Sequence, residues 1–272
     1  MRLSITQPAL PQAKKAPNWL RYTAVTVVLI LAWQLYVTYG GVNPLLVASP
    51  LQTLQALIVD VQDGQLPAAT VSSLQNLVLG IAISAVLGVL LASLSTFSRT
   101  GHDILTVLTA TLNPLPGVAI LPLAMLWFGL TPTAIIVVVV HSALWPIALS
   151  TDMGFRTISQ TTRLVAQNLG LSKFRTVVDI YLPAALPHIL TGLRQAWAFG
   201  WRTVVAAELI FGTAGSAGGL GWYISNARYF LNTPPMFAGL VIISLLGIVV
   251  DGIFLLIERS TVVKWGVKQA AS

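Results

Sequence analysis

The sequence contains no cysteine and very few charged residues. Without cysteine, the chain has no disulfide, no thiol nucleophile and no thiolate metal ligand. Charged residues make up 8% of the 272 positions and hydrophobic residues 56%, whereas soluble domains carry about 25% charged residues. A soluble core of this length cannot bury so much apolar surface. The composition therefore predicts an all-α protein that crosses a membrane several times.

The signatures of several kinds of active site are absent too. No stretch reads G-x-x-x-x-G-K-[ST], so we expect no ATP bound through a P-loop. His102, His141 and His188 are widely spaced and have no carboxylate companion, which argues against a metal site. Ser142 follows His141 without the acid of a catalytic triad, so we interpret it as helix packing. We expect no catalytic residue, metal ligand or cofactor in this chain, and no enzyme activity of its own.

Six hydrophobic segments are each long enough to cross the hydrocarbon core of a bilayer. The predicted spans are residues 19–39, 70–96, 104–129, 133–151, 189–211 and 236–257. Asn113, Pro114, Pro116 and Pro122 interrupt the third segment, and backbone groups freed there need partners inside the protein. We therefore expect that span to begin with an irregular stretch packed against its neighbours.

The segments around the spans complete the predicted organisation. The chain divides into a tail at 1–18, a first span with an external helix at 19–66, a permease-like core at 67–257 and a second tail at 258–272. Ser49 can cap the external helix, and Pro50 suits its first turn. Its apolar stripe consists of Leu51, Leu54, Ile58 and Val61. We expect this helix to lie flat on the outer membrane surface.

Basic residues are placed unevenly on the two sides of the predicted spans. One side has Arg99, Arg156, Arg163, Lys173, Arg175, Arg259, Lys264 and Lys268, and the other has Arg228 with Asp60 and Asp63. Because cytoplasmic loops carry the excess of Lys and Arg, both termini are predicted to be cytoplasmic. This placement accounts for the net charge of +7 without a nucleic-acid partner.

The stretch 164–183, LVAQNLGLSKFRTVVDIYLP, carries regular charge between two hydrophobic segments. It is predicted to form two short helices, because Gly170 readily ends one helix in the left-handed conformation and Ser172 can cap the next. Apolar residues of the second helix recur at helical spacing, at Leu171, Phe174, Val178 and Tyr181. Pro183 and Pro187 are expected to break the helix before the next span. From these residues alone, an ordinary loop on the cytoplasmic membrane surface is an equally good interpretation.

The same stretch resembles the EAA loop of ABC importer permeases, which reads roughly E-A-A-x-x-L-G and continues to V-x-L-P. The matching residues are Ala166, Leu169, Gly170, Leu182 and Pro183. Leu164 stands at the glutamate position and Val165 at the first alanine, which removes a charge from the loop. In the family this loop docks into a groove on the ATPase subunit. The resemblance implies that the docking residues are Val165, Ala166, Gln167, Asn168, Leu169, Gly170, Leu171, Ser172 and Lys173.

Other motifs resemble the permeases that import nitrate, taurine, alkanesulfonates, bicarbonate or phthalate-like acids. They are Ser49-Pro50, residues 74–80, residues 116–122 with Trp127-Phe128-Gly129, Ala206-Ala207-Glu208 with Gly219-Leu220-Gly221, and Asp251 with Glu258-Arg259. The resemblance implies a type I permease fold in the lipid of a bacterial inner membrane and a translocation path for a small anion. It also implies a homodimer of permease chains, two ATPase subunits that bind ATP and magnesium, and a periplasmic or lipid-anchored substrate-binding protein.

The alternative is a secondary transporter driven by an ion gradient, in which Glu208 would be the acidic group inside the membrane. Such transporters often contain inverted repeats, and we find no repeat in this sequence. A secondary transporter also has no need of a loop like 164–183. We therefore favour the importer permease.

Ionisable residues inside the predicted spans are expected to be functional or paired, since a charge that faces lipid is costly. Arg194 and Asp251 lie at similar depths in the fifth and sixth spans, which predicts a structural ion pair. Arg202 lies deeper and is predicted to line the transport path, the alternative being a bond to a backbone carbonyl at a helix interface. Glu208 is about 120° from Arg202 around the helix, so we expect no direct pair between them.

Glu208 precedes a glycine-rich stretch at the end of the fifth span. Its glycines are Gly212, Gly215, Gly218, Gly219 and Gly221, and no lysine accompanies them as in a phosphate-binding loop. We predict that this stretch is a close-packed gate loop and that Glu208 binds its backbone. Glu208, Gly219 and Gly221 are therefore assigned to the gate of the transport path.

Overall fold

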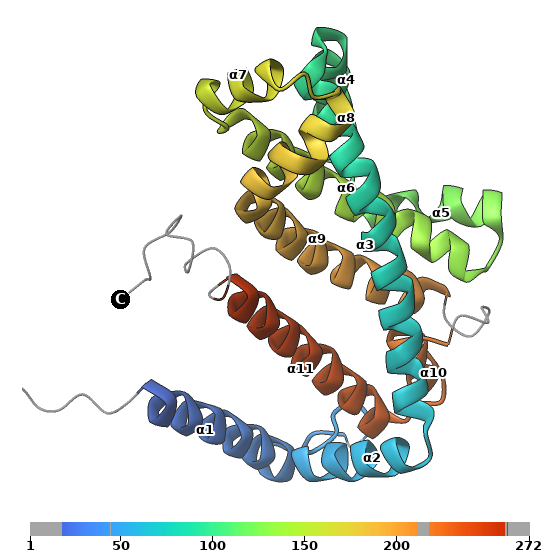
Figure 1. The fold of residues 1–272 in the computed structure, drawn as a ribbon. Helices are drawn as coiled ribbons and strands as arrows, with labels where there is room; N and C mark the ends of the chain where they lie inside the picture. Colours follow the sequence, from blue (N-terminus) through green and yellow to red (C-terminus); the bar gives the residue numbers. More distant parts are fainter. Residues whose placement is uncertain (1–17, 44, 212–217, 259, 261–272) are drawn as a thin grey trace, which may run out of the picture.

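The computed structural model describes residues 18–43, 45–211, 218–258 and 260, and every regular element within them is helical. The elements are α1 (Asn18–Tyr39), α2 (Pro50–Gln62), α3 (Gln65–Phe97), α4 (Arg99–Leu112), α5 (Gly117–Phe128), α6 (Pro132–Arg156), α7 (Gln160–Asn168), α8 (Lys173–Arg175), the π-helix η1 (Thr176–Tyr181), α9 (Leu182–Phe211), α10 (Leu220–Tyr229) and α11 (Thr233–Glu258). Figure 1 shows α7 and α8 gathered at one end of the long helix α3 and α2 at its other end. Most of the two predicted tails, with Gly212 and Gly215, lie outside the described residues.

Among the described residues, five helices are long and apolar enough to cross a membrane: α1, α3, α6, the run Lys173–Phe211 and α11. Helices α4 and α5 meet this criterion only together, and the pair is bent by 97°. The bend falls at residues 113–116, where two prolines cannot supply the N–H groups of a continuing helix. The third predicted segment is therefore two helices with the irregular stretch in its middle rather than at its start. The count is five spans, or six when α4 and α5 are taken as one.

Helix α6 is the centre of the fold and packs most extensively against α9 and α3. The core between these helices includes the buried side chains of Leu77, Ile135, Val138, Val139 and Val204. The helices approach closely at glycines, since a Cβ on Gly80 would lie 2.4 Å from Val139 Cγ1 and one on Gly200 would lie 2.8 Å from Leu77 Cδ1. Small residues allow membrane helices to gain packing contact in this way. Helices α3, α6 and α9 thus form the frame on which the polar residues below are placed.

Helix α9 begins earlier than the sequence predicts. Pro183 and Pro187 were expected to break the chain before the fifth span, but α9 starts at Leu182 and contains Pro187. The π-helical turn η1 ends two residues before Pro183, and its wider winding leaves room where the proline ring would meet the carbonyl group of the preceding turn. The chain is consequently helical without interruption from Lys173 to Phe211.

The external helix α2 has the predicted start. Ser49 Oγ accepts a hydrogen bond from the Gln52 N–H at 3.2 Å, and the Gln52 side chain accepts one from the Ser49 N–H at 2.9 Å. Pro50 occupies the first turn, and the residues of the apolar stripe are exposed. One further helix, α10, was not predicted, and it packs against α11, α9 and α3. It places the residues after the glycine-rich stretch next to the frame helices.

Candidate functional site

The stretch predicted to couple to an ATPase, residues 164–183 and called the coupling segment below, turns at Gly170. Gly170 has a φ of +64°, and the Leu171 N–H donates to the Ala166 carbonyl at 3.3 Å, which closes α7. Ser172 Oγ then accepts a hydrogen bond from the Arg175 N–H at 3.3 Å at the start of α8. Both helix boundaries predicted from Gly170 and Ser172 are present.

The coupling segment presents apolar side chains at its surface. Leu169 and Phe174 are 67% and 76% exposed. Tyr181 is buried instead, with its ring packed against the rings of Phe97 and Phe155. The single apolar side predicted for the second helix is therefore wrong, because the π-helical turn changes the angular spacing and directs Tyr181 inward.

The predicted docking residues are mostly accessible. Val165, Asn168, Leu169, Gly170, Ser172 and Lys173 are exposed, Leu171 is partly buried and Ala166 is buried. The side chain of Gln167 lies outside the described part of the chain. The exposed members of the set share one end of the molecule, the end that carries α7 and α8 in Figure 1.

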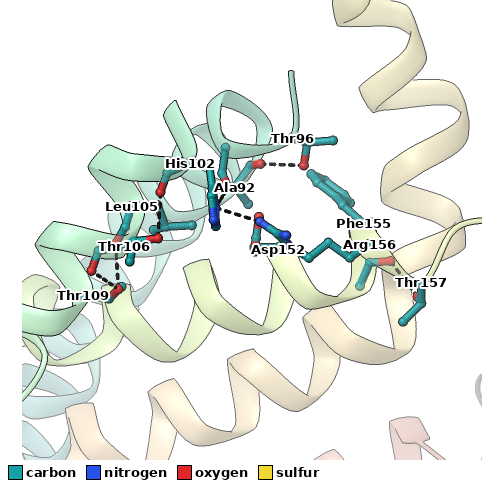
Figure 2. A network of polar contacts seen from close by, with 12 residues as sticks. Ala92, Thr96, His102, Leu105, Thr106, Thr109, Asp152, Phe155, Arg156 and Thr157 are labelled. Atoms are coloured by element: carbon teal, nitrogen blue, oxygen red, sulfur yellow. Dashed lines mark hydrogen bonds and ion pairs between the residues drawn. The ribbon is translucent and has the colours of Figure 1, made fainter. Parts of the chain in front are cut away.

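A polar network joins this end of the molecule to α4 and α6 (Figure 2). Arg156 forms an ion pair with Asp152 one turn earlier on α6, with an Nε to Oδ2 distance of 2.8 Å. Arg156 Nη2 also donates to Nδ1 of His102 on α4 at 2.8 Å. Arg163 of α7 donates to the Phe155 carbonyl at 3.0 Å. These contacts hold the base of the coupling segment against the core.

Glu208 is fully buried near the opposite end of α9. Ser73 Oγ of α3 donates to Glu208 Oε2 at 2.7 Å, and the Gly221 N–H of α10 donates to the same oxygen at 3.0 Å. The Leu220 N–H donates to Ser73 Oγ at 2.8 Å. Two N–H groups at the N-terminus of α10 are thus satisfied by one carboxylate and one hydroxyl. The predicted contact between Glu208 and the backbone of the glycine-rich stretch is present at Gly221.

The N-cap residue Gly219 and the helical residue Gly221 of α10 allow this close contact. A Cβ on Gly219 would lie 2.1 Å from the Glu208 carboxyl carbon, and a Cβ on Gly221 would lie 2.4 Å from the Val205 carbonyl oxygen. Neither position has room for a methyl group. Glu208, Gly219 and Gly221 therefore form one packed unit, and we call it the α10 latch.

Helix α10 is also tied to the external helix α2. The Tyr223 hydroxyl donates a hydrogen bond to Asp60 Oδ2. Burial, with the hydrogen bond to the Asp60 carboxylate, raises the pKa of Tyr223 well above its ordinary value, so the hydroxyl remains a donor. This contact could not be predicted from the sequence, because Asp60 was assigned only to the outer surface and α10 was not predicted.

Arg194 and Asp251 are in contact, as their equal depths predict. Arg194 Nη2 lies 2.7 Å from Asp251 Oδ1, and Glu258 Oε2 lies 3.9 Å from Arg194 Nη1. The Arg194 and Asp251 side chains are 38% and 52% exposed. The pair joins α9 to α11 at the surface of this chain.

We expect Asp251→Asn to lower the stability of the protein without changing which solute it prefers. A partly exposed ion pair contributes about 1 kcal/mol or less, which corresponds to a fall in melting temperature of about 2–4 °C. Arg194→Gln should have a similar effect, and the double variant should be little worse than either single variant. Thermal unfolding of the four purified proteins checks this. A change in the ratio of uptake rates between two anions in Asp251→Asn would contradict a purely structural role.

Arg202 has no hydrogen bond or ion pair with any described residue, although it lies in the run Lys173–Phe211. Its side chain is exposed and borders two cavities. One has a volume of about 390 Å³ and lies beside the α4–α5 bend and α6. The other, of about 470 Å³, also contains Arg194 and Asp251. The alternative in which Arg202 bonds to a backbone carbonyl is not observed within the described part of the chain.

Sequence reasoning missed Ser73, which binds Glu208 of the α10 latch, and its buried neighbour Asn76. Ser73 and Asn76 are buried polar residues of α3, and the Ser73 hydroxyl is the hydrogen-bond partner of a carboxylate 135 positions later. Both residues lie one helical turn apart on α3, and that spacing is the only signal in the sequence. This spacing indicates that Ser73 and Asn76 share one face of α3, but it does not indicate which helix packs against that face.

The fold and these polar residues place the chain among transport proteins. It belongs to the family of binding-protein-dependent transport system inner membrane components, whose model matches residues 80–263. These proteins are the membrane permeases of ABC importers and are not enzymes. The family expected from the coupling segment and the later motifs is therefore confirmed, as is the location in an inner membrane.

Individual relatives cover nearly the whole chain. It is 29% identical over 252 residues to the putative aliphatic sulfonates transport permease protein SsuC of Bacillus subtilis (strain 168), covering 93% of this chain and 90% of SsuC. It is 32% identical over 229 residues to the taurine transport system permease protein TauC of Escherichia coli (strain K12), covering 82% of each chain. It is 28% identical over 256 residues to the nitrate import permease protein NrtB of Synechocystis sp., covering 91% and 90%.

Proposed function

We propose that this chain is the permease subunit of an ATP-driven importer and forms the translocation path for a small anion of the sulfonate, nitrate or carboxylate type. It acts as a homodimer with two ATPase subunits and a substrate-binding protein, and it crosses the membrane six times with both termini in the cytoplasm. The relatives named for sulfonates, taurine and nitrate support an anionic solute. The observation that carries the proposal is the unbroken helix from the coupling segment to the α10 latch.

That helix connects the coupling segment to the α10 latch. It extends from Lys173 to Phe211, 39 residues, or about 58 Å at 1.5 Å per residue. The coupling segment lies at its start and Glu208 near its end. When ATP closes the ATPase subunits, the coupling segments move together and this helix carries the displacement to the latch. The cavities beside Arg202 then change the side of the membrane to which they open.

The surface of the coupling segment suits an ATPase groove. Leu169 and Phe174 are among its most exposed side chains, and apolar side chains exposed at the end of a membrane protein favour a protein partner over water. Leu164, which replaces the family's glutamate, is itself half exposed. The docking contact in this protein is accordingly more apolar than an EAA loop that begins with a charge.

We expect Gly170→Val to release the ATPase while the permease still inserts into the membrane. A Cβ at Gly170 would meet no atom within 4 Å, so the substitution acts chiefly through the φ of +64°. The left-handed conformation costs about 1–2 kcal/mol for an ordinary residue and more for a β-branched one. Gly170→Asn should be nearly normal and Gly170→Ala intermediate. The measurements are co-purification of the ATPase and solute-stimulated ATP hydrolysis.

Gly41 supplies a matched control. Its φ is +63°, and a Cβ there would also meet nothing within 4 Å. Gly41→Val introduces the same backbone strain between α1 and α2, so it should leave ATPase co-purification unchanged. Normal co-purification and hydrolysis in Gly170→Val would disprove the assignment of the coupling segment. Uptake that requires no ATP would instead favour a secondary transporter.

A further inference from the structure

An apolar groove runs along the part of α3 that lies nearest the coupling segment. It has a volume of about 660 Å³ and is lined by residues of the ranges 85–98 and 173–182. Its polar lining is limited to Ser93, Ser98 and Lys173, and Ser93 Oγ already donates to the Val89 carbonyl at 2.7 Å. Residues 85–97 extend about 18 Å along α3, close to half the thickness of a bilayer's hydrocarbon core, about 15 Å. The groove therefore suits a hydrocarbon chain from one leaflet.

A second cavity, of about 560 Å³, lies beside the start of α4 and is basic. Arg99, Arg156 and Arg163 line it, and Asp103 is the acidic residue among the described residues that do so. Positive charge is therefore in excess. The cavity also borders the first turn of α4, where the helix dipole is positive. We call it the basic cavity, and both features favour an anionic group there.

The basic cavity keeps hydrogen-bond donors free for such a group. Arg99 is exposed and has no hydrogen bond or ion pair with a described residue. Arg156 and Arg163 both donate through Nη2, but Nη1 of each has no partner in the described part of the chain. Because Arg156 donates to Nδ1 of His102 (Figure 2), the proton of that ring lies on Nε2, a further donor. Guanidinium groups bind phosphate oxygens through such N–H groups.

The apolar groove and the basic cavity meet at the end of α3. Phe97 and Ser98 line both of them. Phe97 ends the candidate span α3 and Ser98 caps α4, so the boundary lies where the hydrocarbon core gives way to lipid headgroups. The Phe97 ring stacks on the ring of Tyr181 in η1, with centroids 5.6 Å apart, which joins this boundary to the coupling segment. A ligand that fills both spaces has a hydrocarbon chain and an anionic head.

We propose that an anionic phospholipid binds at this boundary, with one acyl chain in the apolar groove and its phosphate in the basic cavity. Basic residues at the end of a membrane span attract anionic lipids, and here an apolar groove of matching length adjoins them. A soluble phosphate would fill the basic cavity alone. A zwitterionic phospholipid has the same phosphate but adds a cation that the arginines repel. The bound lipid touches both α3 and the coupling segment, and so holds that segment against the core from the membrane side.

The test is binding of phosphatidylglycerol to the purified full-length permease complex in detergent, with phosphatidylcholine of the same acyl chains and inorganic phosphate as competitors. We expect phosphatidylglycerol to bind more tightly than phosphatidylcholine and not to be displaced by inorganic phosphate. Arg99→Gln, which breaks no contact within the described residues, should weaken phosphatidylglycerol binding about fivefold, the effect of one basic residue near anionic headgroups. It should leave phosphatidylcholine binding unchanged. Leu90→Trp fills the groove and should weaken binding of both lipids about tenfold, as for the loss of about two buried methylene groups.

Arg175→Gln and Leu79→Trp are the matched controls. Arg175 is exposed on α8 but borders neither space, and Leu79 is an exposed leucine of α3 outside the groove. Both variants should bind phosphatidylglycerol as the wild type does. Equal affinity of the wild type for the two lipids, or unchanged phosphatidylglycerol binding in Arg99→Gln or in Leu90→Trp, would overturn the site. Displacement of the lipid by inorganic phosphate would replace it with a site for free phosphate. These results leave the proposed function intact, because ATP-driven uptake tests that function separately.

Discussion

Arg202→Gln should reduce ATP-driven anion uptake about 10- to 100-fold, the effect of losing one charge-assisted contact, while Arg202→Lys retains part of it. Arginine keeps its charge at any accessible pH, so its position in the run Lys173–Phe211 requires water, an anion or a carboxylate. No described carboxylate pairs with it, and both cavities beside α9 reach its side chain. In a homodimer two copies would give a positive ring around the path. Lysine preserves the charge of that ring but not its forked geometry.

Uptake by reconstituted complexes and ATPase co-purification are the two measurements for the Arg202 variants. Co-purification should stay normal, because Arg202 is distant in sequence from the coupling segment. Arg228 is a suitable control, since it is exposed near the end of α10 and borders neither cavity. Arg228→Gln should transport normally. Equal uptake by wild type, Arg202→Lys and Arg202→Gln would eliminate Arg202 from the transport path.

Gly219→Ala should break the α10 latch and make the complex leak anions without ATP. The added Cβ would lie between 2.1 and 2.3 Å from three atoms of the Glu208 carboxylate, and Glu208 is fully buried and held by hydrogen bonds from Ser73 and Gly221. Gly219 has an ordinary φ of −86°, so crowding rather than backbone strain causes the effect. Overpacking of this kind costs about 1–3 kcal/mol. Helix α10 should separate from Ser73 and Glu208, and the melting temperature should fall.

The latch prediction has a control within α11. A Cβ on Gly252 meets nothing within 4 Å, and alanine favours a helix over glycine. Gly252→Ala should therefore be as stable as the wild type or more so, and should not leak. Passive efflux of nitrate from loaded proteoliposomes, measured without ATP, distinguishes the two variants. A Gly219→Ala complex that is tight and fully stable would show that the latch does not form the gate.

Local sequence signals predicted local structure well. Gly170 with Ser172, and Ser49 with Gln52, determine helix ends through hydrogen bonds within a few residues, so their pattern is sufficient. The ion pair of Arg194 with Asp251 followed from depth alone, because two antiparallel spans bring equal depths together. In these cases the geometry follows either from hydrogen bonds between residues close in sequence or from the depth of a residue in the membrane.

Contacts between helices that are far apart in sequence were not predictable in the same way. Nothing near Ser73 indicates that its partner is Glu208, and Asp60 gives no sign of Tyr223. The rule that proline ends helices failed at Pro183 because η1 accommodates it. In each case tertiary packing decided the outcome.

The α10 latch has a consequence for how the protein is made. Ser73 is synthesised 135 positions before Glu208, but Gly221 follows 13 positions after it. Inserting a carboxylate into a bilayer is unfavourable by about 3 kcal/mol on insertion scales. While α9 inserts, only the polar groups of α3 are available as hydrogen-bond partners for Glu208. The backbone N–H of Gly221 arrives once α10 has left the ribosome. We therefore expect the hydrogen bonding of Glu208 in α9 to be completed only after α10, a later segment, folds back onto α9.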